Sequence, residues 1–232
     1  MPAVKPAFKV GLAGNPNTGK STLFNALTGL KQHTGNWPGK TVLLQKGRCR
    51  YLGRDFELVD LPGTYSLLAN SPEEKAARDF IYFSRPAALV VVMDATCLER
   101  NLNLALQVME ITSRVIVCLN LMDEARRLNL RLDLNRLEKE LGVPVVPTAA
   151  AKKEGLGMLQ DAILRVCTGK LKPKPKPLSY HPLLESKIAG LLPGLNFLTP
   201  AANKRWVALR LLEGDLSVLE EVLTQHGRQS PP

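Results

Sequence analysis

The stretch Gly14-Asn15-Pro16-Asn17-Thr18-Gly19-Lys20-Ser21 decides how this sequence folds. It has a glycine, four free positions and then Gly-Lys-Ser, which is the pattern of a phosphate-binding loop. An apolar run precedes it at residues 8–13, and a helical pattern follows from Thr22. A strand that turns through such a loop into a helix is the context that the motif requires, because the backbone N–H groups and the helix N-terminus then face one anion. The stretch therefore predicts binding of a nucleoside triphosphate.

Three parts of the loop are expected to bind the phosphates and Mg²⁺: the backbone, one lysine and one hydroxyl. Backbone N–H groups surround the phosphate oxygens, Lys20 reaches the outer phosphates, and the Ser21 hydroxyl binds Mg²⁺. The residues predicted to contact the nucleotide here are Gly14, Asn15, Pro16, Asn17, Thr18, Gly19, Lys20, Ser21 and Thr22.

The chain has 232 residues, enough for one α/β domain and a smaller appendage. Its net charge is +10, and basic residues cluster at 31–54 and 170–176. Such clusters can attract nucleic acid or an anionic membrane face, but aromatic residues are not interleaved with them. We interpret them as solvated surface, with weak membrane attraction as the alternative and no nucleic acid as partner.

The cysteines and the apolar runs indicate the compartment. Cys49, Cys97, Cys118 and Cys167 show no paired spacing, which predicts free thiols in a reducing compartment, with Cys97 and Cys118 close to buried strands. The first strand begins within about ten residues, which leaves no room for a secretory signal. The longest apolar run, residues 87–93, is far shorter than the ~20 residues that span a bilayer. We expect a soluble polypeptide.

Strand-like and helix-like patterns alternate from residue 8 to about residue 168. A polar loop at 31–40 should precede an antiparallel hairpin of strands 41–51 and 54–60. Runs at 87–94, 114–120 and 143–148 are typical of buried parallel strands, and Ser71 and Asp133 should cap helices. The pattern predicts a mostly parallel sheet with helices on both faces.

Strand patterns stop after a Lys/Pro-rich segment. We expect a nucleotide-binding domain at residues 1–169, a semi-rigid linker at 170–178 and a small all-α domain at 179–232. Three helical stripes, beginning at Pro182, near Trp206 and after Asp215, should form the core of that last domain.

Two segments, one after a predicted strand and one after the polar loop, fit the phosphate side of a guanine-nucleotide switch. Asp60-Leu61-Pro62-Gly63 supplies a carboxylate for Mg²⁺ and, through Gly63, an N–H for the γ-phosphate. Thr41 could close over Mg²⁺ through its hydroxyl once a γ-phosphate is present. Loss of that phosphate would release both segments, as in a GTPase switch.

Two further segments fit the base. Asp123, in Asn120-Leu121-Met122-Asp123, can accept hydrogen bonds from the guanine N1–H and 2-amino group, which adenine lacks. Asn120 opens this motif. Residues 148–152 follow the next strand, and their backbone N–H groups, at Ala149 and Ala150, could meet guanine O6. Five segments in this order predict a Ras-like P-loop GTPase fold that binds GTP and GDP.

These residues resemble the N-terminal cytosolic domain of the bacterial ferrous-iron transporter B (FeoB) family. The resemblance covers nearly the whole chain and rests on the blocks GNPNTGKSTLFNALTG (14–29), TGNWPGKTV (34–42), DLPGTYSL (60–67), DATCLERNL (94–102) and RWVALRLLEGD (205–215). It implies a GTPase joined to a helical domain that stabilises bound GDP. It also implies a membrane permease region of the same full-length protein for Fe²⁺, a place at the cytoplasmic face of the bacterial inner membrane, and a possible homo-oligomer.

Resemblance to potassium-activated GTPases implies that a bound K⁺ ion assists hydrolysis. Many small GTPases orient the attacking water with a glutamine at the position where this chain has Thr64, which is too short. Asn15 would instead ligate K⁺, with backbone carbonyls of the Gly35-Asn36-Trp37 segment, while Asn15 could also be a turn-stabilising amide. The residues expected to act in hydrolysis are Asn15, Lys20, Thr41 and Gly63.

Departures from the GTPase pattern bear on affinity. Leu121 replaces a lysine that contacts the base, and Ala149 stands where serine is usual, which predicts modest affinity and fast GDP release. Glu73 and Glu74 could orient water, but their position in a first helical turn also explains them. The chain is interpreted as a slow, K⁺-stimulated GTPase that regulates iron import. The alternatives are an RNA- or ribosome-associated assembly GTPase and a GTP-gated interaction module.

Overall fold

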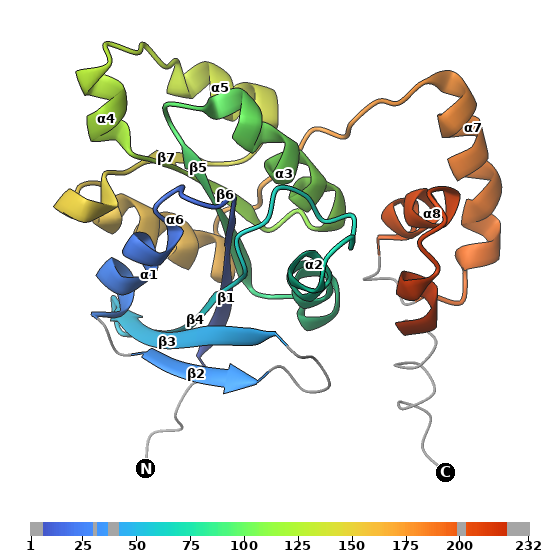
Figure 1. Ribbon diagram of the computed structural model, residues 1–232, viewed down its shortest axis with the longest axis horizontal. Coiled ribbons are helices and arrows are strands. Elements are labelled where there is room, and N and C mark those ends of the chain that lie inside the picture. Colours follow the sequence, from blue (N-terminus) through green and yellow to red (C-terminus); the bar gives the residue numbers. More distant parts are fainter. Residues whose placement is uncertain (1–6, 30–31, 37–41, 199–202, 222–232) are drawn as a thin grey trace. The chain divides into compact units, whose positions relative to one another are not determined.

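The computed structural model describes residues 7–29, 32–36, 42–198 and 203–221 (Figure 1). The chain divides into two compact units, Met1–Lys176 and Pro177–Pro232, and each is described by itself.

The first unit is built on a seven-stranded sheet with strand order β2-β3-β4-β1-β5-β6-β7. The central strands β1, β5 and β6 run parallel with β4 and β7, whereas β3 is antiparallel to both β2 and β4. The strands are β1 (Phe8–Gly14), β2 (Gln32–Asn36), β3 (Leu43–Tyr51), β4 (Arg54–Asp60), β5 (Ala88–Asp94), β6 (Val115–Asn120) and β7 (Val145–Pro147). This confirms the predicted mostly parallel sheet.

Helices cover both faces of this sheet (Figure 1). One face packs on α1 (Lys20–Thr28) and α6 (Leu156–Cys167), through a core that includes Phe24 and Ile163. The other face carries α2 (Pro72–Ser84) and α3 (Leu98–Ile111). Because β5 and β6 are enclosed from both sides, their apolar side chains are almost fully buried.

One glycine sets how closely a helix approaches the sheet. A Cβ on Gly11 of β1 would lie 2.5 Å from Cδ1 of Leu89 and 2.9 Å from Cε1 of Phe80 in α2. Any side chain at this position would push α2 away from the strand that leads into residues 14–21.

The helix ends follow their local sequence signals. The side chain of Ser71 accepts the N–H of Glu74, with Pro72 as the first residue of α2. Asp133 accepts the N–H of Arg136 at the start of α5 (Leu134–Leu141), and Gly142 closes that helix with φ 72°. Both predicted caps are confirmed. The shorter elements are α4 (Met122–Arg127) and the 3₁₀ turn η1 (Ala150–Lys152).

The prediction of a loop across residues 31–40 was wrong for residues 32–36. These form the edge strand β2, in which Thr34 lies opposite Gln45 and Gly35 opposite Leu44 of β3. The sequence of this segment has no apolar alternation, so only its backbone pairing with β3 identifies it as a strand.

The Lys/Pro-rich segment is tied to the first unit by backbone hydrogen bonds. The N–H of Lys174 donates to the carbonyl of Gly142 at 2.9 Å, and the N–H of Lys176 donates to that of Leu141 at 3.1 Å. These bonds hold the segment extended beside the end of α5.

The second unit is helical in its described part. It contains α7 (Pro182–Leu191), the 3₁₀ turn η2 (Leu192–Leu195) and α8 (Lys204–Leu212), and residues 217–221 are helical as well. Arg205 of α8 forms a two-pronged ion pair with Glu185 of α7, with Nη2 2.8 Å from Oε1. Within the described ranges, none of the helices has the length and apolar character needed to span a bilayer.

All four cysteines are free thiols. Cys118 is buried in β6 as expected, and burial raises its pKa to about 12. Cys97 is exposed at the start of α3, shortly after the end of β5, so it also lies close to a buried strand as predicted.

Candidate functional site

The phosphate-binding loop connects β1 to α1 at the carboxyl end of the sheet. Asn17 and Gly19 have positive φ angles of 66° and 77°, which bend the loop back on itself. A Cβ on Gly19 would lie 2.4 Å from Nδ2 of Asn120, and the Thr18 hydroxyl donates to the carbonyl of Asn15 at 2.9 Å. The loop therefore has the curled form that aims N–H groups at an anion.

Lys20 and Asp60 meet at the centre of the site. The ammonium of Lys20 donates to Oδ1 of Asp60, and the Ser21 hydroxyl lies 3.4 Å from Oδ2. Burial raises the pKa of Asp60 above its ordinary value, against the opposing charge of Lys20 and the bonds from Lys20 and Ser21. A buried carboxylate beside a hydroxyl is a fitting donor set for Mg²⁺, which takes oxygen ligands.

Gly63, whose N–H is predicted to meet the γ-phosphate, lies beside the loop. A Cβ on Gly63 would lie 3.4 Å from Cα of Pro16, and the N–H of Thr64 donates to the carbonyl of Gly14 at 3.3 Å. The Thr64 side chain is itself buried. The structure thus brings together the phosphate-binding loop, residues 14–21, and the Asp60–Gly63 segment.

Asn120 links the base side to the phosphate side. Its Nδ2 donates to the carbonyl of Thr18 at 2.9 Å, and its Oδ1 accepts from the Thr148 hydroxyl at 3.1 Å and from the N–H of Ala150 at 3.0 Å. Only 1% of Asn120 is exposed, so both ends of this amide are bonded inside the protein. The predicted guanine motif and the phosphate loop are therefore one connected assembly.

Asp123 lies at the start of α4 with its carboxylate near Lys152. The two charged groups are 3.2 Å apart, and 17% of the Asp123 side chain is exposed. Desolvation opposes ionisation of Asp123, but the hydrogen bond and charge of Lys152 outweigh it, so its pKa is lowered from the ordinary value. Leu121, with φ 61°, turns the chain so that Asp123 follows directly after β6.

The backbone N–H groups of Ala149 and Ala150 are already paired. Ala149 exchanges hydrogen bonds with Glu154, at 3.2 Å in both directions, and Ala150 donates to Asn120. In this arrangement neither N–H is available to guanine O6. Ala151 is exposed, and its N–H has no partner within the described residues, so it is the better donor.

Asn15 lies inside the loop rather than on its surface. Its Nδ2 donates to the carbonyl of Arg100 at 3.2 Å, and its Oδ1 is buried with no partner in the described part of the chain. Only 3% of Asn15 is exposed, whereas Asn17 is exposed.

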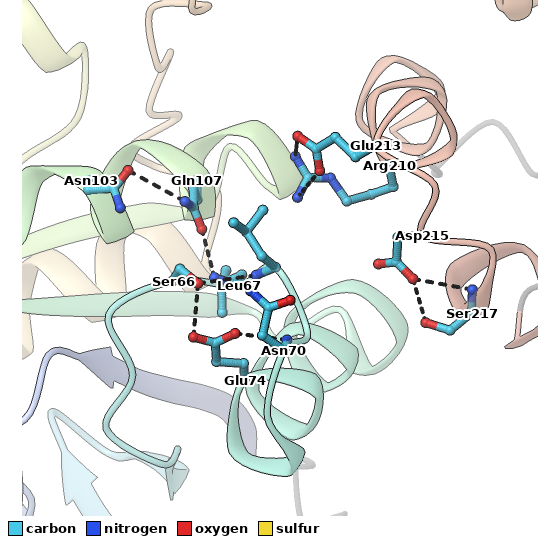
Figure 2. A network of polar contacts seen from close by, with 11 residues as sticks. Ser66, Leu67, Asn70, Glu74, Asn103, Gln107, Arg210, Glu213, Asp215 and Ser217 are labelled. Carbon is cyan, nitrogen blue, oxygen red and sulfur yellow. Dashed lines mark hydrogen bonds and ion pairs between the residues drawn. The ribbon is translucent and has the colours of Figure 1, made fainter.

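The segment after Gly63 is held on two sides (Figure 2). Glu74 of α2 accepts the Ser66 hydroxyl at 2.9 Å with Oε1 and the Asn70 N–H at 3.0 Å with Oε2. From α3, Oε1 of Gln107 accepts the Leu67 N–H at 2.7 Å. The carboxylate of Glu74 is therefore engaged in bracing this segment.

Sequence reasoning missed the contacts from α3. Arg100, Asn103 and Gln107 recur at the spacing of one helical face, which reads as ordinary solvated surface. The signal that could have revealed them is that this polar face begins within DATCLERNL (94–102), one of the blocks on which the family resemblance rests.

Thr41 and Trp37, which the sequence predicts for the site, lie outside the described residues. Gly35 lies in β2, three strand positions from β1, which corresponds to roughly 14 Å at the usual strand spacing. Among the described residues, no three His, Cys, Asp or Glu side chains gather as a metal cluster.

The chain was compared with known families and proteins. Residues 8–163 match the family profile described as ferrous iron transport protein B, and residues 180–230 match the FeoB cytosolic helical domain. The Fe(2+) transporter FeoB of Shigella flexneri is 39% identical over 214 residues, which cover 89% of this chain and 27% of the relative. The chain thus spans little more than a quarter of that relative's length.

Solved structures of FeoB cytosolic domains resemble this chain in both fold and sequence. The cytosolic domain of T. maritima FeoB in a GDP form matches with TM-score 0.86 and 37% identity over 94% of this chain and 85% of that one. Its GMPPNP form matches with TM-score 0.84 and 36% identity over 97% and 87%. With the phosphate loop, the guanine motif and the helical unit all in place, the chain belongs to the FeoB family and comprises its GTP-binding domain and its cytosolic helical domain.

Proposed function

We propose that this chain hydrolyses GTP slowly, with stimulation by K⁺, and thereby regulates ferrous-iron transport by a membrane region of the same full-length protein. The observation that carries the proposal is the assembly of Lys20, Asp60, Gly63 and Asn120 around one loop. The GDP and GMPPNP forms of the T. maritima relative support guanine nucleotides as its ligands.

Guanine would be selected by Asp123. Its lowered pKa keeps the carboxylate ionised at neutral pH, as acceptance of the N1–H and 2-amino donors requires. The N–H of Ala151, rather than those of Ala149 and Ala150, would meet O6 without breaking an existing bond.

The phosphates would be bound by the loop N–H groups and Lys20. Ser21 and Asp60, with Thr41, would hold Mg²⁺, whose charge would stabilise the β- and γ-phosphate oxygens. For that purpose Lys20 must leave Asp60 and turn to the phosphates. Gly63 would donate its N–H to the γ-phosphate.

A loop asparagine would supply the side-chain ligand for K⁺. Asn15 is supported by its buried, unpartnered Oδ1, but its Nδ2 is committed to Arg100 and the residue is almost fully enclosed. Asn17 is exposed at the bend of the loop, so its amide can reach a cation beside the phosphates without breaking any contact. We therefore favour Asn17 as the direct ligand and Asn15 as the residue that holds the loop on α3.

The test measures GTP turnover in KCl and in NaCl for the natural chain, Asn15→Ala and Asn17→Ala. Turnover should be higher in KCl, and the difference should vanish in Asn17→Ala. If it vanishes only in Asn15→Ala, Asn15 is the ligand. Equal turnover in both salts would exclude cation stimulation, and calorimetry showing equal binding of ATP and GTP would exclude the nucleotide assignment.

The helical domain at residues 179–232, joined through 170–178 to the GTPase domain at 1–169, would slow the release of GDP. Comparison of GDP dissociation from the full chain and from a chain ending at Lys176 tests this, because loss of a GDP-stabilising domain should speed release. Sedimentation in GDP and in GMPPNP would show whether a homo-oligomer forms.

The RNA-binding alternative gains no support from the hairpin. Basic residues of β3 face acidic ones of β4, with Arg50 Nε 3.6 Å from Asp55 and Arg48 opposite Glu57. Such pairing reduces the positive potential that phosphate binding needs.

A further inference from the structure

Helix α3 presents a row of polar side chains to the segment that follows Gly63. The Arg100 guanidinium lies 4.6 Å from the centre of the Tyr65 ring and donates to its hydroxyl. Nδ2 of Asn103 lies 3.5 Å from the Tyr65 carbonyl. Oε1 of Gln107 accepts the Leu67 N–H at 2.7 Å, and its Nε2 lies 3.4 Å from Oδ1 of Asn103 (Figure 2).

The three contacts differ in strength. Arg100 and Tyr65 are exposed, so water competes with their interaction. The Asn103 contact is at the outer limit of hydrogen-bond length. The Gln107 bond is short, and the Leu67 side chain beside it is 2% exposed, so this bond fixes the backbone most firmly.

The other end of the same segment is fixed to β1 and the phosphate loop. Leu61 donates its N–H to Leu12 at 3.0 Å, and Thr64 donates to Gly14 at 3.3 Å. Gly63, which must place its N–H on the γ-phosphate, therefore lies between two anchored stretches.

The same helix also holds the phosphate loop. The carbonyl of Arg100, about two helical turns before Gln107, accepts Nδ2 of Asn15. Helix α3 is thus bonded both to the loop that wraps the phosphates and to the segment that senses the γ-phosphate.

From this geometry we propose that Gln107 is a positioning residue for GTP hydrolysis, which holds residues 63–67 in register with the phosphate loop by accepting the Leu67 N–H. The inference rests on the proposed GTPase function. Gln107 touches no substrate. It acts by keeping the backbone of Gly63 and Thr64 at the distance from the loop that the γ-phosphate requires.

The experiment compares Gln107→Leu with Gln107→Glu in the full chain. Leucine removes the acceptor, whereas glutamate keeps an oxygen acceptor of the same reach. In Gln107→Leu, kcat should fall about fivefold, the equivalent of one ordinary hydrogen bond, with GDP affinity unchanged because GDP has no γ-phosphate. Gln107→Glu should retain near-natural kcat. Glu99→Gln, an exposed substitution on the same helix, should leave kcat unchanged.

Hydrogen exchange of the Leu67 amide gives a readout that does not depend on turnover. Exchange should speed up about fivefold in Gln107→Leu and be restored in Gln107→Glu. If the natural chain had no GTPase activity, the proposed function would be overturned. Exchange at Leu67 would then still test whether Gln107 holds the Leu67 N–H. Unchanged kcat in Gln107→Leu, an equal loss in both variants, or unaltered exchange at Leu67 would overturn the positioning by Gln107.

Discussion

The side chain of Asn120 bonds to the backbone of Thr18, with Nδ2 2.9 Å from the carbonyl oxygen. The residue that opens the guanine motif thereby supports the loop that wraps the phosphates. Its remaining bonds, to Thr148 and Ala150, join the last strand to the same point. One buried amide consequently joins the predicted guanine motif to the phosphate loop.

Replacing Asn120 by alanine should therefore weaken nucleotide binding and stability together. The change removes hydrogen bonds to Thr18, Thr148 and Ala150 and leaves their groups buried, which should cost about 3 kcal/mol of unfolding free energy. Urea unfolding without nucleotide measures the stability, and GDP titration measures the affinity. Asn135→Ala on the exposed face of α5 serves as control and should change neither quantity. Unfolding at the natural urea midpoint would show that the amide does not support the loop.

Replacing Asp123 by asparagine should shift the nucleotide preference from GTP to XTP. Asparagine at this position presents an NH₂ donor where guanine also presents donors, so Asp123→Asn should weaken GTP binding about a hundredfold, while xanthosine triphosphate, with an oxygen at that position, should bind better. Competition binding with GTP, XTP and ATP measures the change. The variant loses the charge partner of Lys152, so Lys152→Ala is the matched control and should keep its preference for GTP. A variant that still prefers GTP over XTP would place the selecting group elsewhere.

The sequence predicted those parts of the fold that depend on local signals. Ser71 and Asp133 are caps because a hydroxyl or carboxylate at that position can accept a free helix N–H, whatever packs nearby. The turn at Leu52 and Gly53, both with positive φ, follows in the same way from a two-residue hairpin loop.

The features that the sequence did not predict depend on contacts between residues that are far apart in the chain. Strand β2 is polar and glycine-containing, and only the free edge of β3 makes it a strand. The N–H groups of Ala149 and Ala150 are occupied because Glu154 and Asn120 lie opposite them in space, which residue type alone does not reveal. The use of Gln107 as an acceptor for Leu67 is hidden for the same reason, since a half-buried glutamine on a helix resembles any other surface residue.

Substitution of Ala149 by serine should slow GDP release. Ala149 is 1% exposed and is the N-cap residue of η1, a position at which a serine hydroxyl can accept an N–H of the turn and so stiffen this loop. We expect dissociation about fivefold slower, the effect of one added hydrogen bond. Stopped-flow displacement of a fluorescent GDP analogue measures the rate, with Ala7→Ser as the exposed control. Unchanged or faster dissociation in Ala149→Ser would contradict the expectation.

The helical unit should lose stability in acid through Glu185. The hydrogen bonds from Arg205 and from the N–H of Tyr180 lower the pKa of Glu185 to about 2, from an ordinary value of 4.5. A depressed carboxyl pKa contributes stability above the unfolded value, and this contribution is lost as pH falls from about 4.5 toward about 2.

Fluorescence of Trp206 follows this unit alone if Trp37, the other tryptophan, is replaced by phenylalanine. In that background the melting temperature should fall across this pH window, and the fall should be smaller in both Glu185→Gln and Arg205→Gln, since either change removes the pair. Above pH 5 both variants should melt below the parent, and the curves should converge near pH 2. A parent whose melting temperature follows the same pH curve as the two variants would mean that the ion pair does not stabilise the helical unit.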